Sequence, residues 1–129
     1  MRPTRNRSVC DDNNSDCNEA AGIVWDQTIR SAEQAYDRTS DCSFTSFVGY
    51  EYTRSTNNTH MHRNTIFKNA SVPESPASFI DFPSLQLLLA ELETSCWQGI
   101  EQCDVISIPH NSNISGGNGF KPNTLIGCS

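Results

Sequence analysis

The sequence predicts an α/β fold, either an α/β sheet or a sector of a (β/α) barrel with mainly parallel strands. One observation is the order of the expected elements, which is helix, strand, strand, helix, strand. Another is that Glu51, His62 and His110 each stand beside or just after an apolar, strand-like run. The third is length, because 129 residues suffice for one domain but not for a complete barrel of roughly 200 to 250 residues.

The amino-terminal region is expected to be an irregular segment. Residues 1–20 are polar and rich in Asn and Asp, a composition that favours a loop. The rest of the chain, residues 21–129, is expected to form a single domain that is incomplete as a barrel.

A helix is expected over residues 23–38, and the best strand of the chain over residues 44–52. The apolar side chains of the helix recur at helical spacing and share one face. They are Trp25, Ile29, Ala32, Ala35 and Tyr36. The side chains of the strand alternate between two sides. One side carries Phe44, Val48, Tyr50 and Tyr52, and the other carries Phe47, Gly49 and Glu51.

The second half of the chain is expected to add two strands and a helix. After a polar loop at residues 55–59, a short strand is expected at residues 64–68. Residues 69–83 contain three prolines, which exclude a regular helix or a central strand and indicate an ordered excursion. A helix then follows, with an apolar stripe formed by Leu85, Leu88, Leu89, Leu92 and Cys96. Residues 104–109 are expected to form a short buried strand that ends at His110.

The six cysteines indicate an oxidising compartment, in which disulfides persist. Two pairs each enclose six residues, a loop short enough for a local disulfide: Cys10 with Cys17, and Cys96 with Cys103. Cys42 and Cys128 are left to pair with each other or with segments outside this chain. Zinc binding by the cysteines is the alternative, but no Cys-x-x-Cys knuckle is present, so disulfides are favoured.

Charge and hydropathy exclude two classes of partner. The net charge is −6 and the basic residues form no cluster beyond the first seven residues, which argues against general nucleic-acid binding. No apolar run is long enough to span a bilayer. The charged start of the chain is followed by no hydrophobic segment typical of a secretory signal. With the cysteines, this leads us to expect an internal fragment of a longer exported protein.

Several separated blocks, in order, carry a resemblance to a known family. They include FTSFVGYEYT at residues 44–53, HRN at residues 62–64 and IPHNSN at residues 108–113. Over about residues 8–121 the chain resembles the domain-of-unknown-function family DUF3604. That family is similar to the PHP (polymerase and histidinol phosphatase) metal-dependent phosphoesterases.

The resemblance implies a distorted (β/α) barrel of PHP-like type, with two or three metal ions bound at strand ends. By position, Glu51, His62 and His110 match metal ligands, and the metal would be Zn, Mn or Fe. We expect these side chains to lie together at the C-terminal edge of a mainly parallel sheet. The family's opening His-x-His, Asp-His and late Asp-x-His blocks have no counterpart, so the metal site is expected to be incomplete and the isolated chain inactive. His60 departs from the family pattern and is expected to be a satisfied core residue or a surface residue.

Two functions remain open at this point. In the first, the chain is part of a metal-dependent hydrolase of phosphate or related esters, exported to the periplasm or the extracellular space of a bacterium. Arg63, Asn64, Asn111 and Asn113 would then bind a small-molecule or ester substrate, although Arg63 equally suits a pair with a local acid. In the second, the chain is a non-catalytic exported binding or scaffold domain, whose polar groups fix loops by hydrogen bonds. Metal content separates the two.

Overall fold

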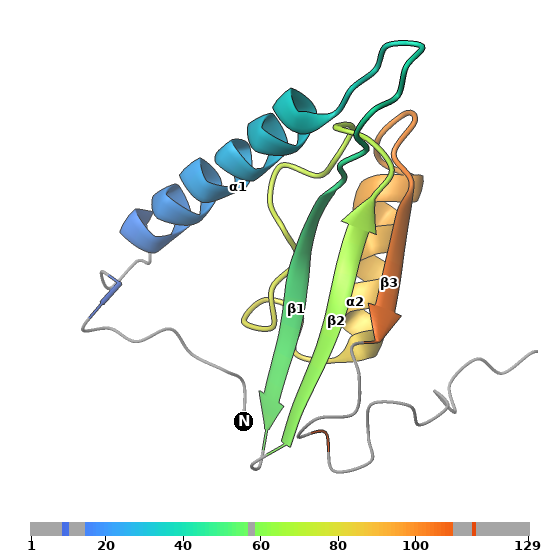
Figure 1. Cartoon of the computed structure of the whole chain (residues 1–129). Coiled ribbons are helices and arrows are strands. Elements are labelled where there is room, and N and C mark those ends of the chain that lie inside the picture. The colour runs from blue at the N-terminus through green and yellow to red at the C-terminus, as the bar shows by residue number, and fades with distance from the viewer. Residues whose placement is uncertain (1–8, 11–14, 57–58, 110–114, 116–129) are drawn as a thin grey trace, which may run out of the picture.

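The structure, a computed structural model, describes residues 9–10, 15–56, 59–109 and 115. Its elements in chain order are α1 (Ser15–Ala35), β1 (Val48–Thr56), β2 (Thr59–Phe67), α2 (Leu85–Leu92), the π-helical turn η1 (Glu93–Trp97) and β3 (Val105–Pro109). The three strands form one sheet in the order β1-β2-β3 (Figure 1). α1 lies beside β1, and α2 lies behind β2 and β3 in the same view.

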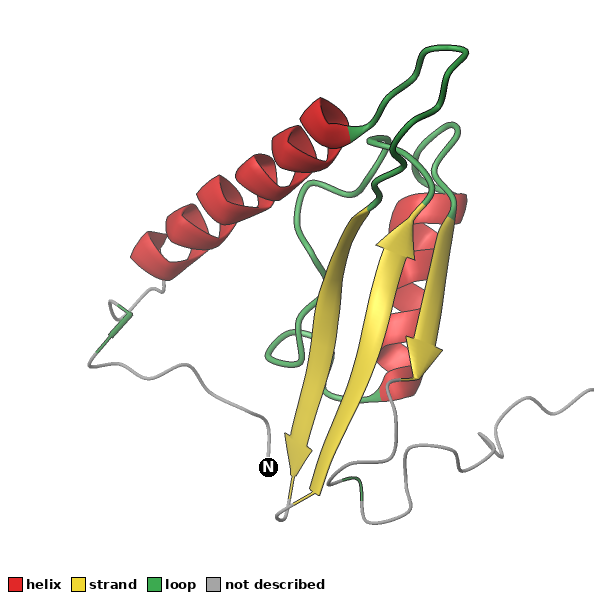
Figure 2. Ribbon diagram, viewed as in Figure 1, coloured by secondary structure: helices red, strands yellow, loops and turns green. Residues whose placement is uncertain are grey.

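The prediction of a mainly parallel, barrel-like sheet is wrong. β1 pairs antiparallel with β2, and β2 pairs antiparallel with β3 (Figure 2). Only residues 57 and 58 separate Thr56 from Thr59, and these two threonines are register partners. A parallel connection needs a crossover of roughly a dozen residues or more, whereas two residues suffice for an antiparallel hairpin. The described fold is therefore a three-stranded antiparallel sheet with two helices, and it is not a sector of a (β/α) barrel.

The boundaries of the elements also differ from those predicted. β1 begins four residues later than expected, at Val48, and β2 begins at Thr59 instead of residue 64. Of the residues expected to form a polar loop, 55 and 56 belong to β1 and 59 belongs to β2. Thr56 and Thr59 are β-branched, and such residues suit extended backbone. α1 begins at Ser15, so helix replaces part of the segment expected to be irregular.

Trp25 is the one buried residue among the described side chains of α1, and it anchors this helix to the sheet. Trp25 is 3% exposed, and its ring lies edge-on to Tyr50 and Phe67, with centroids 5.9 and 6.0 Å away. Its indole N–H donates to the carbonyl oxygen of Pro73 at 2.9 Å. Ile23 and Val24 on the same helix are exposed. No helix among the described residues has both the length and the apolar character needed to cross a membrane.

The core lies between one face of the sheet and α2. The strands contribute Val48, Tyr52, Phe67 and Val105, and α2 with η1 contributes Leu88, Leu92 and Cys96. The hydroxyl of Ser84 caps α2 by accepting a hydrogen bond from the backbone N–H of Leu87. The predicted leucine stripe is therefore confirmed as the buried side of a short helix for Leu88 and Leu92, while Leu89 is exposed.

Both predicted disulfides are present. Cys10 is bonded to Cys17 and Cys96 to Cys103, with Cα atoms 5.4 and 5.2 Å apart. The second disulfide joins η1 to the turn before β3, and both of its cysteines are buried. Among the described residues Cys42 is a free, exposed thiol. Two disulfides fit a protein of an oxidising compartment.

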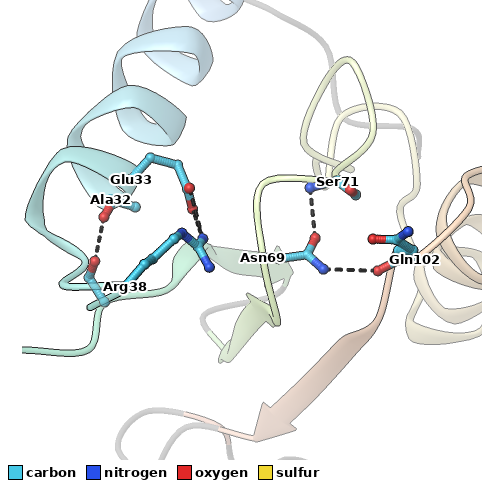
Figure 3. A network of polar contacts seen from close by, with 7 residues as sticks. Ala32, Glu33, Arg38, Asn69, Ser71 and Gln102 are labelled. Carbon is cyan, nitrogen blue, oxygen red and sulfur yellow. Dashed lines mark hydrogen bonds and ion pairs between the residues drawn. The ribbon is translucent and has the colours of Figure 1, made fainter. Parts of the chain in front are cut away.

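The proline-containing excursion between β2 and α2 is fixed by polar contacts. The side-chain amide of Asn69 donates to the carbonyl oxygen of Gln102 at 3.1 Å and accepts from the backbone N–H of Ser71 at 2.7 Å (Figure 3). Tyr52 donates its hydroxyl to the carbonyl oxygen of Phe82 at 2.7 Å. As predicted, this stretch contains neither a regular helix nor a strand.

Candidate functional site

The pleat of the sheet sorts its side chains onto two faces. The face toward α2, here called the core face, carries the buried aromatic and aliphatic residues described above. The opposite face, here called the histidine face, carries every alternate residue. These residues are Gly49, Glu51, Thr53 and Ser55 on β1, His60, His62, Asn64 and Ile66 on β2, and Ile106 and Ile108 on β3.

Glu51 and His62 contact each other on the histidine face. Glu51 is in register with Asn64, and Thr53 is in register with His62, so Glu51 and His62 are diagonal neighbours. Diagonal positions are within reach of long side chains. The Oε1 atom of Glu51 lies 2.6 Å from Nδ1 of His62, and the two side chains are 46% and 20% exposed.

The hydroxyl of Thr53 completes this contact and indicates the tautomer of His62. Thr53 donates to Oε1 of Glu51 at 3.1 Å, and its Oγ1 lies 3.0 Å from Nδ1 of His62. The hydroxyl of Thr53 has one proton, which it donates to Glu51, so its oxygen can only accept from Nδ1 of His62. The carboxylate of Glu51 can also only accept from Nδ1. Both contacts therefore favour a proton on Nδ1 of His62, so that in the neutral ring Nε2 carries the lone pair.

His60 is the next residue of β2 on the same face. Its Nδ1 lies 2.8 Å from Oγ of Ser55, its register partner on β1. Its ring is nearly parallel to that of His62, with an interplanar angle of 19° and centroids 6.2 Å apart. No functional role is predicted for His60 from the sequence. The two-residue spacing of His60 and His62 is the sequence signal for a shared face, because alternate residues of a strand point to the same side and residues 59–67 form a strand.

The two predicted substrate residues on β2 lie on opposite faces. Asn64 is on the histidine face, in register with Glu51 on one side and with Ile108 on the other. Arg63 is on the core face, where its Nε donates to Oγ of Ser107 at 3.0 Å and its Nη2 donates to the carbonyl oxygen of Ser107. Burial lowers the pKa of the Arg63 guanidinium. Arg63 thus joins β2 to β3 across the sheet.

The remaining predicted site residues, His110, Asn111 and Asn113, lie outside the described residues. The residue before them, Pro109, is in register with Arg63. The structure thus brings together Glu51 and His62 of the expected ligand set. They lie within β1 and β2 and not at a C-terminal sheet edge, because antiparallel strands share no such edge. Within the part of the chain that the structure describes, no group of three or more His, Cys, Asp or Glu side chains is arranged to hold a metal ion.

An apolar groove, which the sequence did not reveal, lies at the other end of the sheet. Its volume is about 280 Å³, and it is lined by Phe47, Ile66, Phe67, Lys68, Asp104, Val105 and Ile106. Phe47 and Ile106 are 56% and 55% exposed. Ile66 and Ile106 are register partners on the histidine face. This face therefore has a polar end that carries Glu51 and the histidines, and an apolar end.

Comparison with known proteins identifies the family of the chain. No curated protein and no solved structure matches the chain. The family model described as a protein of unknown function, DUF3604, matches residues 2–129. Because this match covers nearly the whole sequence, the chain belongs to the DUF3604 family.

Proposed function

We propose that this chain is part of a metal-dependent hydrolase of phosphate or related esters, and that the protein is exported to the periplasm or the extracellular space. The observation that supports this most directly is the contact between Glu51 and His62. A carboxylate that accepts from one ring nitrogen of a histidine fixes the tautomer and raises the basicity of the other nitrogen, an arrangement common around bound metals. The disulfides support the location.

The donor set suits Zn, Mn or Fe, which accept imidazole nitrogen and carboxylate oxygen. His62 would bind through Nε2. Glu51 would hold His62 in place through Nδ1, and it would add its carboxylate to the metal site only by turning away from Nδ1. His110, which follows β3 in the sequence, is the third ligand of the proposal. A divalent metal would supply Lewis-acid stabilisation of the negative charge that develops on the ester oxygens.

Asn64 is the described residue best placed to bind substrate, because it is the register partner of Glu51 on the same face. Its side-chain amide offers donors for an ester oxygen and an acceptor for a hydroxyl. Asn111 and Asn113, which follow His110, extend the proposed substrate set. Arg63 receives no substrate contact in this proposal, because its guanidinium is bonded to Ser107 on the core face.

Metal binding and hydrolysis test this proposal together. Zn²⁺ or Mn²⁺ is titrated into the tag-free chain, with Glu51→Gln and His62→Ala as variants and Glu74→Gln as a control that alters an exposed carboxylate elsewhere. Each site variant should weaken binding about 10- to 100-fold, since loss of a ligand or of its carboxylate partner has effects of this order. The control should bind as the wild type does.

Hydrolysis of a generic aryl phosphate is measured with the same metals. We expect background rates from the 129-residue chain, whose ligand set is incomplete, and metal-dependent turnover from a longer reading frame that supplies further ligands. That turnover should be lost in His110→Ala and in His62→Ala. Turnover that persists in both variants would reject the proposed site.

The second candidate is a non-catalytic binding or scaffold domain, and the apolar groove beside Phe47 and Ile106 favours it. Apolar grooves with few polar groups suit ligand binding and do not require a metal. If the second candidate is right, no longer protein that contains this chain hydrolyses the aryl phosphate with any added metal. Glu51→Gln should then leave the binding of an apolar ligand to the groove unchanged.

A further inference from the structure

We propose that His60 and His62 together chelate a transition-metal ion on the histidine face of the hairpin. The two histidines are separated by Met61 alone, so both side chains project from the same face of β2. Their rings are nearly parallel, with centroids 6.2 Å apart. The inference shares His62 with the proposed function and deepens that site by adding a ligand that the resemblance to the family does not supply.

The spacing of the two rings is compatible with one shared ion. Nitrogen ligands bind Zn²⁺ at about 2.0–2.1 Å, so two of them in a tetrahedral shell lie roughly 3.4 Å apart. The ring centroids are 6.2 Å apart and each ligating nitrogen lies about 1 Å from its centroid, so a tilt alone leaves the two nitrogens about 4 Å apart, and the rings must also move closer together. Rotation about the χ1 and χ2 torsions of the two histidines moves the rings as well as tilting them, without a change in the strand.

A second observation is that each ring is held at Nδ1 by a side chain of β1. Oγ of Ser55 lies 2.8 Å from Nδ1 of His60. Oε1 of Glu51 lies 2.6 Å from Nδ1 of His62, and Oγ1 of Thr53 lies 3.0 Å from the same atom. Metal-binding histidines characteristically use their other ring nitrogen in this way. The arrangement occurs twice, at adjacent positions of one face, and Nε2 is the ligating atom of both rings in this proposal.

The ligand chemistry is that of a borderline divalent cation. Imidazole nitrogen suits Zn²⁺, Ni²⁺ and Cu²⁺, and among them Cu²⁺ binds most tightly to a given nitrogen site. Cu²⁺ is therefore the most sensitive probe, and Zn²⁺ is one of the ions that suit the proposed function. The remaining coordination positions are left to water, to Glu51 or to His110, and the inference requires only the two histidines of β2.

The experiment is a Cu²⁺ and Zn²⁺ titration of the tag-free chain, with electron paramagnetic resonance of the Cu²⁺ form. His60→Ala should weaken binding at least tenfold and remove one nitrogen from the hyperfine pattern. His60→Asn should do the same, while its amide stands at the position of Nδ1, where it can keep the hydrogen bond to Ser55, and so guards against a loss caused by misfolding. Ser55→Ala, which alters only the positioning of His60, should weaken binding a few-fold and leave the number of bound nitrogens unchanged.

The variants separate this inference from the proposed function. If His60→Ala weakens binding and His110→Ala does not, the two-histidine chelate stands and the three-ligand set of the proposed function fails. If His62→Ala and His110→Ala weaken binding and His60→Ala has no effect, the chelate is overturned and the proposed ligand set stands. Unchanged binding in His60→Ala with both nitrogens retained, or no binding below millimolar concentration in the wild type, overturns the chelate.

Discussion

On the core face of the sheet Val48, Tyr52 and Phe67 are each 1% exposed, whereas on the histidine face Ile106 is 55% exposed. The two faces come from the same three strands and differ only in which alternate residues they carry. The core face is packed against α2 and holds the apolar side chains that stabilise the fold. The histidine face holds the imidazoles, the carboxylate and the amide that can bind ligands. Substitutions on the two faces should therefore affect different properties.

The largest expected effect is on the core face. Phe67→Ala should lower the free energy of unfolding by about 3–5 kcal/mol, because it removes a buried ring and leaves a cavity. Ile106→Ala, on the histidine face, should change it by less than about 1 kcal/mol, since half of that side chain is already exposed. Urea denaturation measures both. Similar losses for the two variants would show that the histidine face is packed as tightly as the core face.

The disulfide behind the core face should have the next largest effect. Replacing both Cys96 and Cys103 by Ala should lower the free energy of unfolding by about 2–3 kcal/mol, because a short loop in the unfolded chain is no longer closed. Cys42→Ala is the control, and it should lie within about 0.5 kcal/mol of the wild type, since that thiol is exposed and unpaired. Thermal unfolding without reductant gives both values. A double variant as stable as the control would mean that packing alone holds η1 to β3.

The chain has one buried tryptophan, Trp25, and one exposed tryptophan, Trp97, so their substitution tests the effect of burial. Trp25→Phe should lower the free energy of unfolding by about 1–3 kcal/mol, because the part-buried hydrogen bond to the carbonyl oxygen of Pro73 is lost and the smaller ring fills less of the buried site of Trp25. Trp97 also donates its indole N–H, to Asp104 at 3.2 Å, but its side chain is 58% exposed. Trp97→Phe should therefore cost at most about 0.5 kcal/mol. Guanidinium denaturation, monitored by far-ultraviolet circular dichroism, measures the free energy of unfolding of both variants. Equal losses would show that Trp25 does not anchor α1 to the sheet.

The smallest effect is confined to alkaline pH. Burial raises the pKa of the Tyr50 phenol from 10.0 to about 12. The unfolded chain releases this proton near pH 10 and the folded chain only near pH 12, so the contribution of Tyr50 to stability is complete below pH 10 and falls as the pH rises toward 12. Tyr50→Phe should flatten this part of the stability profile in unfolding experiments from pH 7 to 11.5. A profile as steep as that of the wild type would assign the alkaline loss to other groups.

Part of the candidate site could be predicted from the sequence. Alternation along β1 correctly separated Glu51 from Tyr50 and Tyr52, and this is a local property of extended backbone. The expected loop at residues 55–59 places the start of the second strand at residue 64, whereas β2 begins at Thr59. The pair Asn57 and Asn58, flanked by Thr56 and Thr59, is a hairpin signal in the sequence, since Asn tolerates the backbone of tight turns. Without that hairpin, the contacts of His60 with Ser55 and of His62 with Glu51 could not be foreseen.

The sequence by itself determined what depends on near neighbours in the chain. The spacing of the cysteines predicted both disulfides, the leucine periodicity predicted α2, and the prolines excluded regular structure from the excursion. Only the tertiary structure decided the direction of the strands and the pairing of residues between them. The direction of a strand depends on which neighbouring strand it pairs with and in which register. Such pairing joins residues far apart in the sequence, such as Arg63 of β2 and Ser107 of β3. The diagonal contact of Glu51 with His62 likewise follows from the antiparallel register, which sequence alternation does not specify.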